Sequence, residues 1–155
     1  MSDGTVGDRL RGAGLDLPGA RPPAGAYASV VVDGDHVYTS GAVSVREGVV
    51  VAGRLGDDVD VAGGQRAAAL ACLQALANIE AEVGDLARVG RVLKATGYVR
   101  CTPDFTSLSA VVDGASEVLL TAFGERGRGA RSAIGVASLP LGACVELELV
   151  LALRP

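Results

Sequence analysis

One arginine and one glutamate near the C-terminal end of the chain are the residues best suited to chemistry. Arg131 opens the apolar segment 131–137, and Glu146 lies in the alternating segment 145–150. If both segments are strands, Arg131 shares a face only with small residues, which leaves room for a ligand, and Glu146 shares a face with Glu148. A cation and an acid on two neighbouring strands predict a polar pocket on a rigid support.

The same alternation predicts which side of each segment enters the core. In the first segment, the residues that point away from Arg131 are expected on the core side: Ser132, Ile134 and Val136. In the second segment, the expected core residues are Val145, Leu147, Leu149 and Leu151.

Length and composition bound the class of protein. A length of 155 residues predicts one domain, residues 1–155. Hydrophobic residues make up 49% of the chain and aromatic residues 3%, so valine, leucine and alanine must build the core. The net charge is −4 and the basic residues are scattered, which argues against nucleic acid as a partner. No segment approaches the ~20 apolar residues of a membrane span, and we expect a cytoplasmic protein.

Several other chemistries find no support in the sequence. His36 is the one histidine and lies beside a predicted hairpin turn. Cys72, Cys101 and Cys144 are odd in number and lack the spacing of a zinc site or a disulfide framework. We therefore expect no metal and no cofactor, and three buried thiols in a reducing compartment.

The predicted elements alternate between strands and two helices. Residues 1–25 are expected to form a short amphipathic piece and an extended arm, because glycine and proline are frequent there. The strands are predicted at 27–32, 37–39, 49–52, 90–100, 131–137 and 145–150, with a hairpin turn at Asp33-Gly34. The first helix is predicted from Val61 to Val83, between Asp60 and Gly84 as caps, and the second from Gly114 to Phe123, with Asp113 as N-cap and Gly124 as terminator.

This order, β-β-(β)-α-β-α-β-β, predicts an α+β fold with a mixed sheet and both helices on one face. The other face of the sheet then has no cover from the chain itself. Association with further copies of the chain is the natural way to cover it.

The motifs resemble those of the reactive-intermediate deaminase family, also called Rid or YjgF. The matching motifs are Tyr-Thr-Ser-Gly at 38–41, Ala-Arg-Ser at 130–132, Leu-Pro at 139–140 and Val-Glu-x-Glu at 145–148. Further motifs are similar to a longer branch of that family, and they lie at 14–18, 112–116 and 123–128.

The resemblance implies a chorismate-mutase-like fold and a homotrimer with pockets at the subunit interfaces. It implies hydrolysis of enamines or imines, such as 2-aminoacrylate, to a keto acid and ammonia without a cofactor. Arg131 would bind the substrate carboxylate, because its planar fork pairs with two carboxylate oxygens. Glu146 would orient water and transfer protons at the imine carbon and nitrogen.

The resemblance also implies a set of substrate contacts. The backbone of Gly41 and of Ala133 would contact the substrate, Ser40 would shape that edge, and Tyr27 would lie near the mouth. Three positions depart from the family: Ala133 replaces a cysteine, Gly129 stands where the longer branch often has histidine and the founding members have proline, and Asp113 replaces a pocket-facing asparagine. Asp113 would oppose a bound carboxylate if it faced the ligand, and would be harmless as a helix cap.

Two other functions stay open at this stage. The first is a trimer that binds small carboxylates without catalysis, or a homologue that acts on a different substrate in one specific pathway. The second is a ribonuclease, which the acidic charge and the scattered basic residues disfavour.

Overall fold

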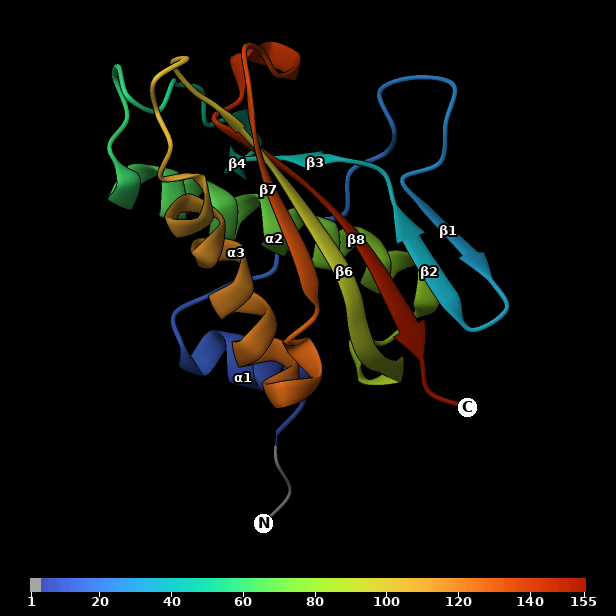
Figure 1. Ribbon diagram of the computed structural model, residues 1–155. Helices are drawn as coiled ribbons and strands as arrows, with labels where there is room; N and C mark the ends of the chain where they lie inside the picture. The colour runs from blue at the N-terminus through green and yellow to red at the C-terminus, as the bar shows by residue number, and fades with distance from the viewer. Residues whose placement is uncertain (1–3) are drawn as a thin grey trace.

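A mixed sheet with helices on one face forms the body of the protein, whose computed structural model describes residues 4–155 (Figure 1). The strand order in the main sheet is β1-β2-β8-β6-β7, and β3 pairs with β8. The strands of this sheet are β1 (Val30–Asp33), β2 (His36–Thr39), β3 (Ala42–Val43), β6 (Val89–Arg100), β7 (Ala130–Val136) and β8 (Val145–Leu153). A small second sheet pairs β4 (Val45–Arg46) with β5 (Val49–Val50).

The helices confirm the α+β class. The α-helices are α1 (Val6–Gly12), α2 (Val61–Val83) and α3 (Leu108–Phe123), and short 3₁₀ helices are η1 (Leu86–Arg88), η2 (Gly124–Gly127) and η3 (Pro140–Gly142). Figure 1 shows α2 and α3 on the same face of the main sheet. We call this the covered face, and the opposite side of the main sheet the open face.

The long helix α2 has the predicted bounds and caps. Asp60 accepts a hydrogen bond from the Gly63 amide at 2.7 Å, and Gly84 ends the helix with a φ of 88°. Its alanines let α3 approach closely, and a Cβ on Gly114 of α3 would lie 2.1 Å from the carbonyl oxygen of Gln65. The two helices therefore touch backbone to backbone at Gly114.

The second helix begins earlier in the chain than the sequence predicted. The helix α3 begins at Leu108, with Ser107 at the N-cap position, so Asp113 lies inside the helix and does not cap it. The physical reason is packing, since Val111 and Val112 are fully buried and extend the apolar face of the helix toward its start.

The strand order corrects the prediction that the last two strands are neighbours. β7 follows β6 through the crossover helix α3 and pairs with it in parallel, with Ala95 opposite Arg131. β8 pairs antiparallel on the other side of β6, with Tyr98 opposite Glu146. The whole of β6 therefore separates Arg131 from Glu146.

The faces of β7 are also the reverse of the prediction. Ile134 was expected in the core and is 41% exposed on the open face, whereas Gly135 faces the helices. A Cβ on Gly135 would lie 2.9 Å from Cys101 Sγ and 3.4 Å from Leu108. The small size of Gly135 is therefore explained by the close approach of Cys101 and Leu108.

The other strand predictions hold with smaller changes. In β8 the expected core residues are all buried: Val145, Leu147, Leu149 and Leu151. The β1–β2 hairpin turns at Gly34, whose φ is 62°, but β1 begins at Val30, so Tyr27 precedes the strand. The weak strand is reduced to β5 and an isolated bridge at Ala52, and β3 and β4 were not predicted.

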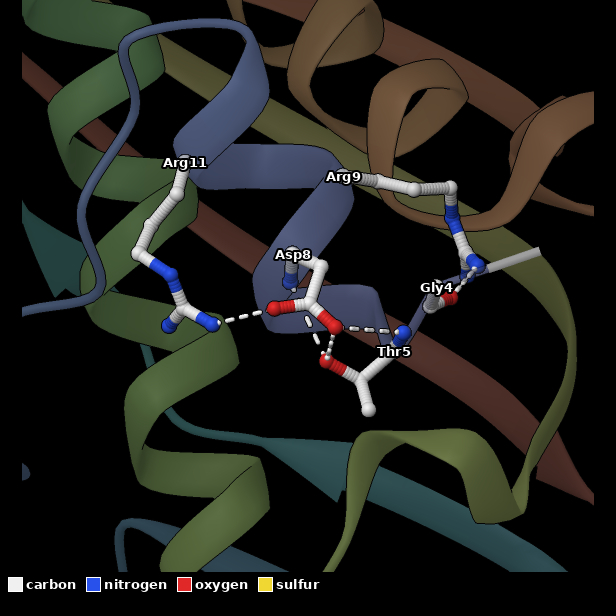
Figure 2. A network of polar contacts seen from close by, with 5 residues as sticks. All are labelled: Gly4, Thr5, Asp8, Arg9 and Arg11. Atoms are coloured by element: carbon white, nitrogen blue, oxygen red, sulfur yellow. Dashed lines mark hydrogen bonds and ion pairs between the residues drawn. The ribbon is translucent and has the colours of Figure 1, made fainter. Parts of the chain in front are cut away.

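The N-terminal piece forms a third helix, α1, with a complete capping box. Figure 2 shows the Asp8 carboxylate accepting from the Thr5 amide, while the Thr5 hydroxyl oxygen accepts from the Asp8 amide. Leu10 is fully buried, and Arg9 donates to the carbonyl oxygen of Ala122 at the end of α3. Because α1 packs beside α3, it leaves the open face uncovered (Figure 1).

Candidate functional site

The predicted site residues fall into two groups that one chain does not bring together. We call Tyr27, Ser40, Gly41 and Glu146 the glutamate group, and Asp113, Arg131 and Ala133 the arginine group. Arg131 lies opposite Ala95 and Glu146 opposite Tyr98, and these two β6 residues point to different faces of the sheet. Arg131 is thus on the covered face and Glu146 on the open face.

The glutamate group lines one pocket of about 180 Å³ where β2 bends into β3. Gly41 and Glu146 are in close contact there, and a Cβ on Gly41 would lie only 1.9 Å from Glu146 Oε1. A side chain at position 41 would therefore push the Glu146 carboxylate out of its place. Of the seven predicted site residues, the structure thus brings Tyr27, Ser40, Gly41 and Glu146 together in this pocket.

Glu146 has an altered acidity in this pocket. Partial burial raises the pKa of the Glu146 carboxyl, and the nearby charge of Glu148 raises it further. Glu148 also accepts a hydrogen bond from the Tyr98 hydroxyl at 3.1 Å, and burial together with this bond raises the pKa of Tyr98. A carboxyl that keeps its proton to higher pH is better suited to accept a proton and return it during a reaction.

Hydroxyl groups hold the strand ends that frame the pocket. Thr39 Oγ1 accepts from the Leu149 amide at 2.9 Å, which fixes the end of β2 on β8. Ser40 donates to the Ala28 carbonyl oxygen at 2.6 Å and so ties the bend to the segment that carries Tyr27. The hydroxyl of Ser40 is therefore already used within the chain.

Sequence reasoning missed two residues of α2 that line the same pocket. Asn78 accepts from the Arg21 amide at 2.9 Å, and buried Gln74 donates to the Gly19 carbonyl oxygen at 3.0 Å. Both hold the N-terminal arm against α2. Their signal in the sequence is the presence of two amides four residues apart, on one face of the otherwise apolar middle of the helix, residues 67–79.

In the arginine group, Arg131 is held by side chains and backbone of α3. Its Nη1 donates to Asp113 Oδ1 at 2.7 Å and to Ser116 Oγ at 3.0 Å. Its Nη2 donates to Ser109 Oγ at 2.7 Å and to the Ser109 carbonyl oxygen at 3.2 Å. Ala133, two residues further along β7, packs against the core on the same face.

The two serines that hold Arg131 were also missed. Ser109, Asp113 and Ser116 are spaced i, i+4, i+7, so they form one stripe on a helix. The signal was hidden because Asp113 was taken for the start of the helix. With Leu108 as the first residue, the stripe points at β7 and meets Arg131.

The described part of the chain offers no site for a metal ion. Residues 4–155 contain no group of three or more histidine, cysteine or acidic side chains that could hold one. His36 contacts the Asp35 carboxylate at 2.8 Å at the protein surface. In the same range, no helix is long and apolar enough to cross a membrane.

Comparison with known families decides the relationship. A family model described as "YjgF/chorismate_mutase-like, putative endoribonuclease" matches residues 7–153. The chain belongs to this YjgF family. The Rid/YjgF resemblance and the chorismate-mutase-like fold predicted from the sequence are thereby confirmed.

Individual YjgF relatives cover almost the whole chain. "Protein TCP17" of Trypanosoma cruzi is 41% identical over 99% of this chain and 98% of its own length. The "2-iminobutanoate/2-iminopropanoate deaminase" of Dermatophagoides farinae is 30% identical over 90% of this chain and 95% of its own. The crystal structure of a "putative endoribonuclease" from Shewanella oneidensis superposes with a TM-score of 0.92 at 31% identity, covering 96% of this chain and 99% of that one.

Proposed function

We propose that the protein hydrolyses small enamines or imines, of the 2-aminoacrylate type, to 2-keto acids and ammonia. Family membership and the similarity to a protein named as an imine deaminase support the reaction class. The observation that carries the proposal is the contact between Gly41 and Glu146. It places an acid of raised pKa against exposed backbone in a small pocket, where a water and an imine can meet it.

In this proposal Glu146 manages the protons of the reaction. The carboxylate takes a proton from water, whose oxygen bonds to the imine carbon, and the proton is returned to the nitrogen. Glu146 next removes the hydroxyl proton of the resulting carbinolamine and delivers it to the amino nitrogen, so that the C–N bond breaks, ammonia leaves and a carbonyl group remains. For an enamine substrate, the protonated carboxyl group first gives its proton to the terminal carbon, which forms an iminium ion, and the carboxylate then takes back an N–H proton to leave the imine.

Arg131 is proposed to bind the substrate carboxylate, and this requires two protomers. Arg131 and Glu146 lie on opposite faces of one sheet, with β6 between their strands. β7 is an edge strand, so Arg131 lies where a neighbouring copy can approach. We therefore place the site between the arginine group of one protomer and the glutamate group of the next.

The open face supports assembly of copies. Val31, Tyr38 and Ile134 expose apolar surface there, with exposed fractions of 51%, 46% and 41%. A sheet face of this kind is usually covered in the working form of a protein. We propose a homotrimer, in which a closed ring gives every arginine group a partner glutamate group.

The test is a coupled assay in which a lyase generates 2-aminoacrylate and the release of pyruvate is followed. The wild-type protein should accelerate the release, and Glu146→Gln and Arg131→Ala should each lose about 100-fold or more of that rate. Glu117→Gln, an exposed charge removal on α3, is the control and should retain the wild-type rate.

The outcomes separate the enzyme from a binding protein. If the wild-type protein gives no acceleration over Arg131→Ala, the deaminase proposal is wrong for this substrate. Binding of a keto acid that depends on Arg131, without turnover of any imine tested, would support the carboxylate-binding trimer.

A further inference from the structure

The hydrogen-bonding capacity of Arg131 is almost fully used by its own chain. An arginine side chain has five N–H donors, two on each terminal nitrogen and one on Nε. Both donors of Nη1 and both donors of Nη2 have partners on α3. Of the five donors of Arg131, only Nε–H has no partner among residues 4–155. A carboxylate that binds in the bidentate way must therefore displace at least one of the α3 groups.

Asp113 is the partner whose charge affects a ligand. Its Oδ1 lies 2.7 Å from Arg131 Nη1, whereas the other groups that hold the guanidinium are uncharged. The side chains of Arg131 and Asp113 are 21% and 54% exposed, so a ligand can reach the pair from solvent. A carboxylate bound to the same guanidinium lies within a few ångströms of Asp113, and the two negative charges repel each other.

We propose that Asp113 is a specificity-determining residue, which weakens the binding of free carboxylates at Arg131 relative to uncharged ligands of the same shape. The inference rests on the proposed function, because it takes Arg131 as a substrate-binding residue. A carboxylate substrate that binds in the bidentate way displaces one of the α3 groups and then lies close to the negative charge of Asp113. Imines whose carboxyl group is masked as an amide or ester meet no such repulsion, and their carbonyl oxygen can accept from Nε–H. The site is thus tolerant of uncharged substrates.

The charge of Asp113 can be removed without changing its shape. In Asp113→Asn the Oδ1 oxygen still accepts from Nη1, so Arg131 keeps its position while the negative charge is lost. The probes are 2-oxobutanoate and its uncharged amide, 2-oxobutanamide, titrated by NMR against wild type and variant. Glu117→Gln is the matched control, since it removes an equal charge from an exposed position one turn further along α3.

We expect Asp113→Asn to bind 2-oxobutanoate about tenfold more tightly, because the repulsion between two like charges a few ångströms apart in well-solvated surroundings corresponds to roughly a tenfold change in affinity. The affinity for the amide should stay within about twofold, and Glu117→Gln should change neither affinity. Asp113→Ala, which also removes the charge, should show the same gain and serves if the asparagine variant is poorly folded.

The result separates this inference from the function on which it rests. If Arg131→Ala loses keto-acid binding but Asp113→Asn gains none, Asp113 does not set specificity, and the proposed role of Arg131 stands. An equal gain for the acid and the amide would show an effect of packing instead of charge and would overturn the inference. If Arg131→Ala binds 2-oxobutanoate as well as wild type does, both proposals are wrong.

Discussion

The two faces of the main sheet hold their ionisable groups in opposite ways. On the covered face, the charge of Arg131 is met by Asp113 and by hydroxyl and carbonyl oxygens of α3. On the open face, the two acids Glu146 and Glu148 lie near each other, and the pKa of Glu146 is raised by burial and by this neighbour. The charge of Arg131 is thus neutralised by a partner, whereas the Glu146 carboxyl binds its proton more tightly than usual.

This difference suits Arg131 and Glu146 to different roles. A guanidinium that is held on several sides gives a ligand a fixed anchoring point, which suits binding. A carboxyl with a raised pKa holds its proton to higher pH than usual, which suits proton transfer. The two properties need different environments, and a sheet provides them on its two faces. In the proposed trimer, symmetry brings the faces of two copies together.

The sharpest test of the two-protomer site is complementation between inactive variants. Arg131→Ala and Glu146→Gln should each be nearly inactive, and a mixture refolded together should recover activity. If each site takes Arg131 from one protomer and Glu146 from the next, about a quarter of the sites in randomly mixed trimers are intact. The lyase-coupled assay measures the recovery. If the mixture stays as inactive as each variant alone, Arg131 and Glu146 of neighbouring protomers do not form a shared site.

The glutamate group should be very sensitive to one added methyl group. In Gly41→Ala the new Cβ would overlap Glu146 Oε1 and push the carboxyl out of place, so we expect about a 100-fold loss in kcat. Gly12→Ala is the control, because its Cβ has no atom within 4 Å and should be neutral. Full activity of Gly41→Ala would mean that the position of Glu146 does not matter for turnover.

The faces should also differ in what they contribute to stability. Leu147 is fully buried on the covered face, and Leu147→Ala should lower the free energy of unfolding by about 2–5 kcal/mol. Ile134→Ala on the open face should cost about 0.5 kcal/mol in the monomer and act mainly on assembly. Denaturant unfolding and light scattering measure the two effects. Similar losses of monomer stability would contradict the contrast between the faces.

A smaller effect is expected on the pH dependence of kcat/KM. The charge of Glu148 helps to raise the pKa of Glu146, so the base form of Glu146 appears only at higher pH than usual. Glu148→Gln removes that charge and should lower the pKa of Glu146, which moves the acidic limb of the kcat/KM profile to lower pH. A limb that stays in place or moves upward would show that Glu148 does not act through charge.

Periodicity was a good guide wherever local rules decide structure. α2 has the predicted bounds, because a capping aspartate, a terminating glycine and a regular apolar stripe all act within one or two turns. The alternation in β8 identified its core face for the same reason. In β7 the same rule failed, because the face with the larger side chains was predicted to be the core face. The covered face carries Gly135 instead, since Cys101 and Leu108 approach it closely and leave no room for a larger residue.

What the sequence alone determined is the class of fold, the family, and a short set of polar residues that includes Arg131 and Glu146. These follow from residue types and from spacings of a few positions, which local geometry converts into helices and strands. Only the tertiary structure decided which of those residues meet. The α3 crossover inserts β6 between β7 and β8, and a single-residue step along a strand reverses a side chain's face. Strand order and facing are long-range outcomes of packing, and no short motif encodes them.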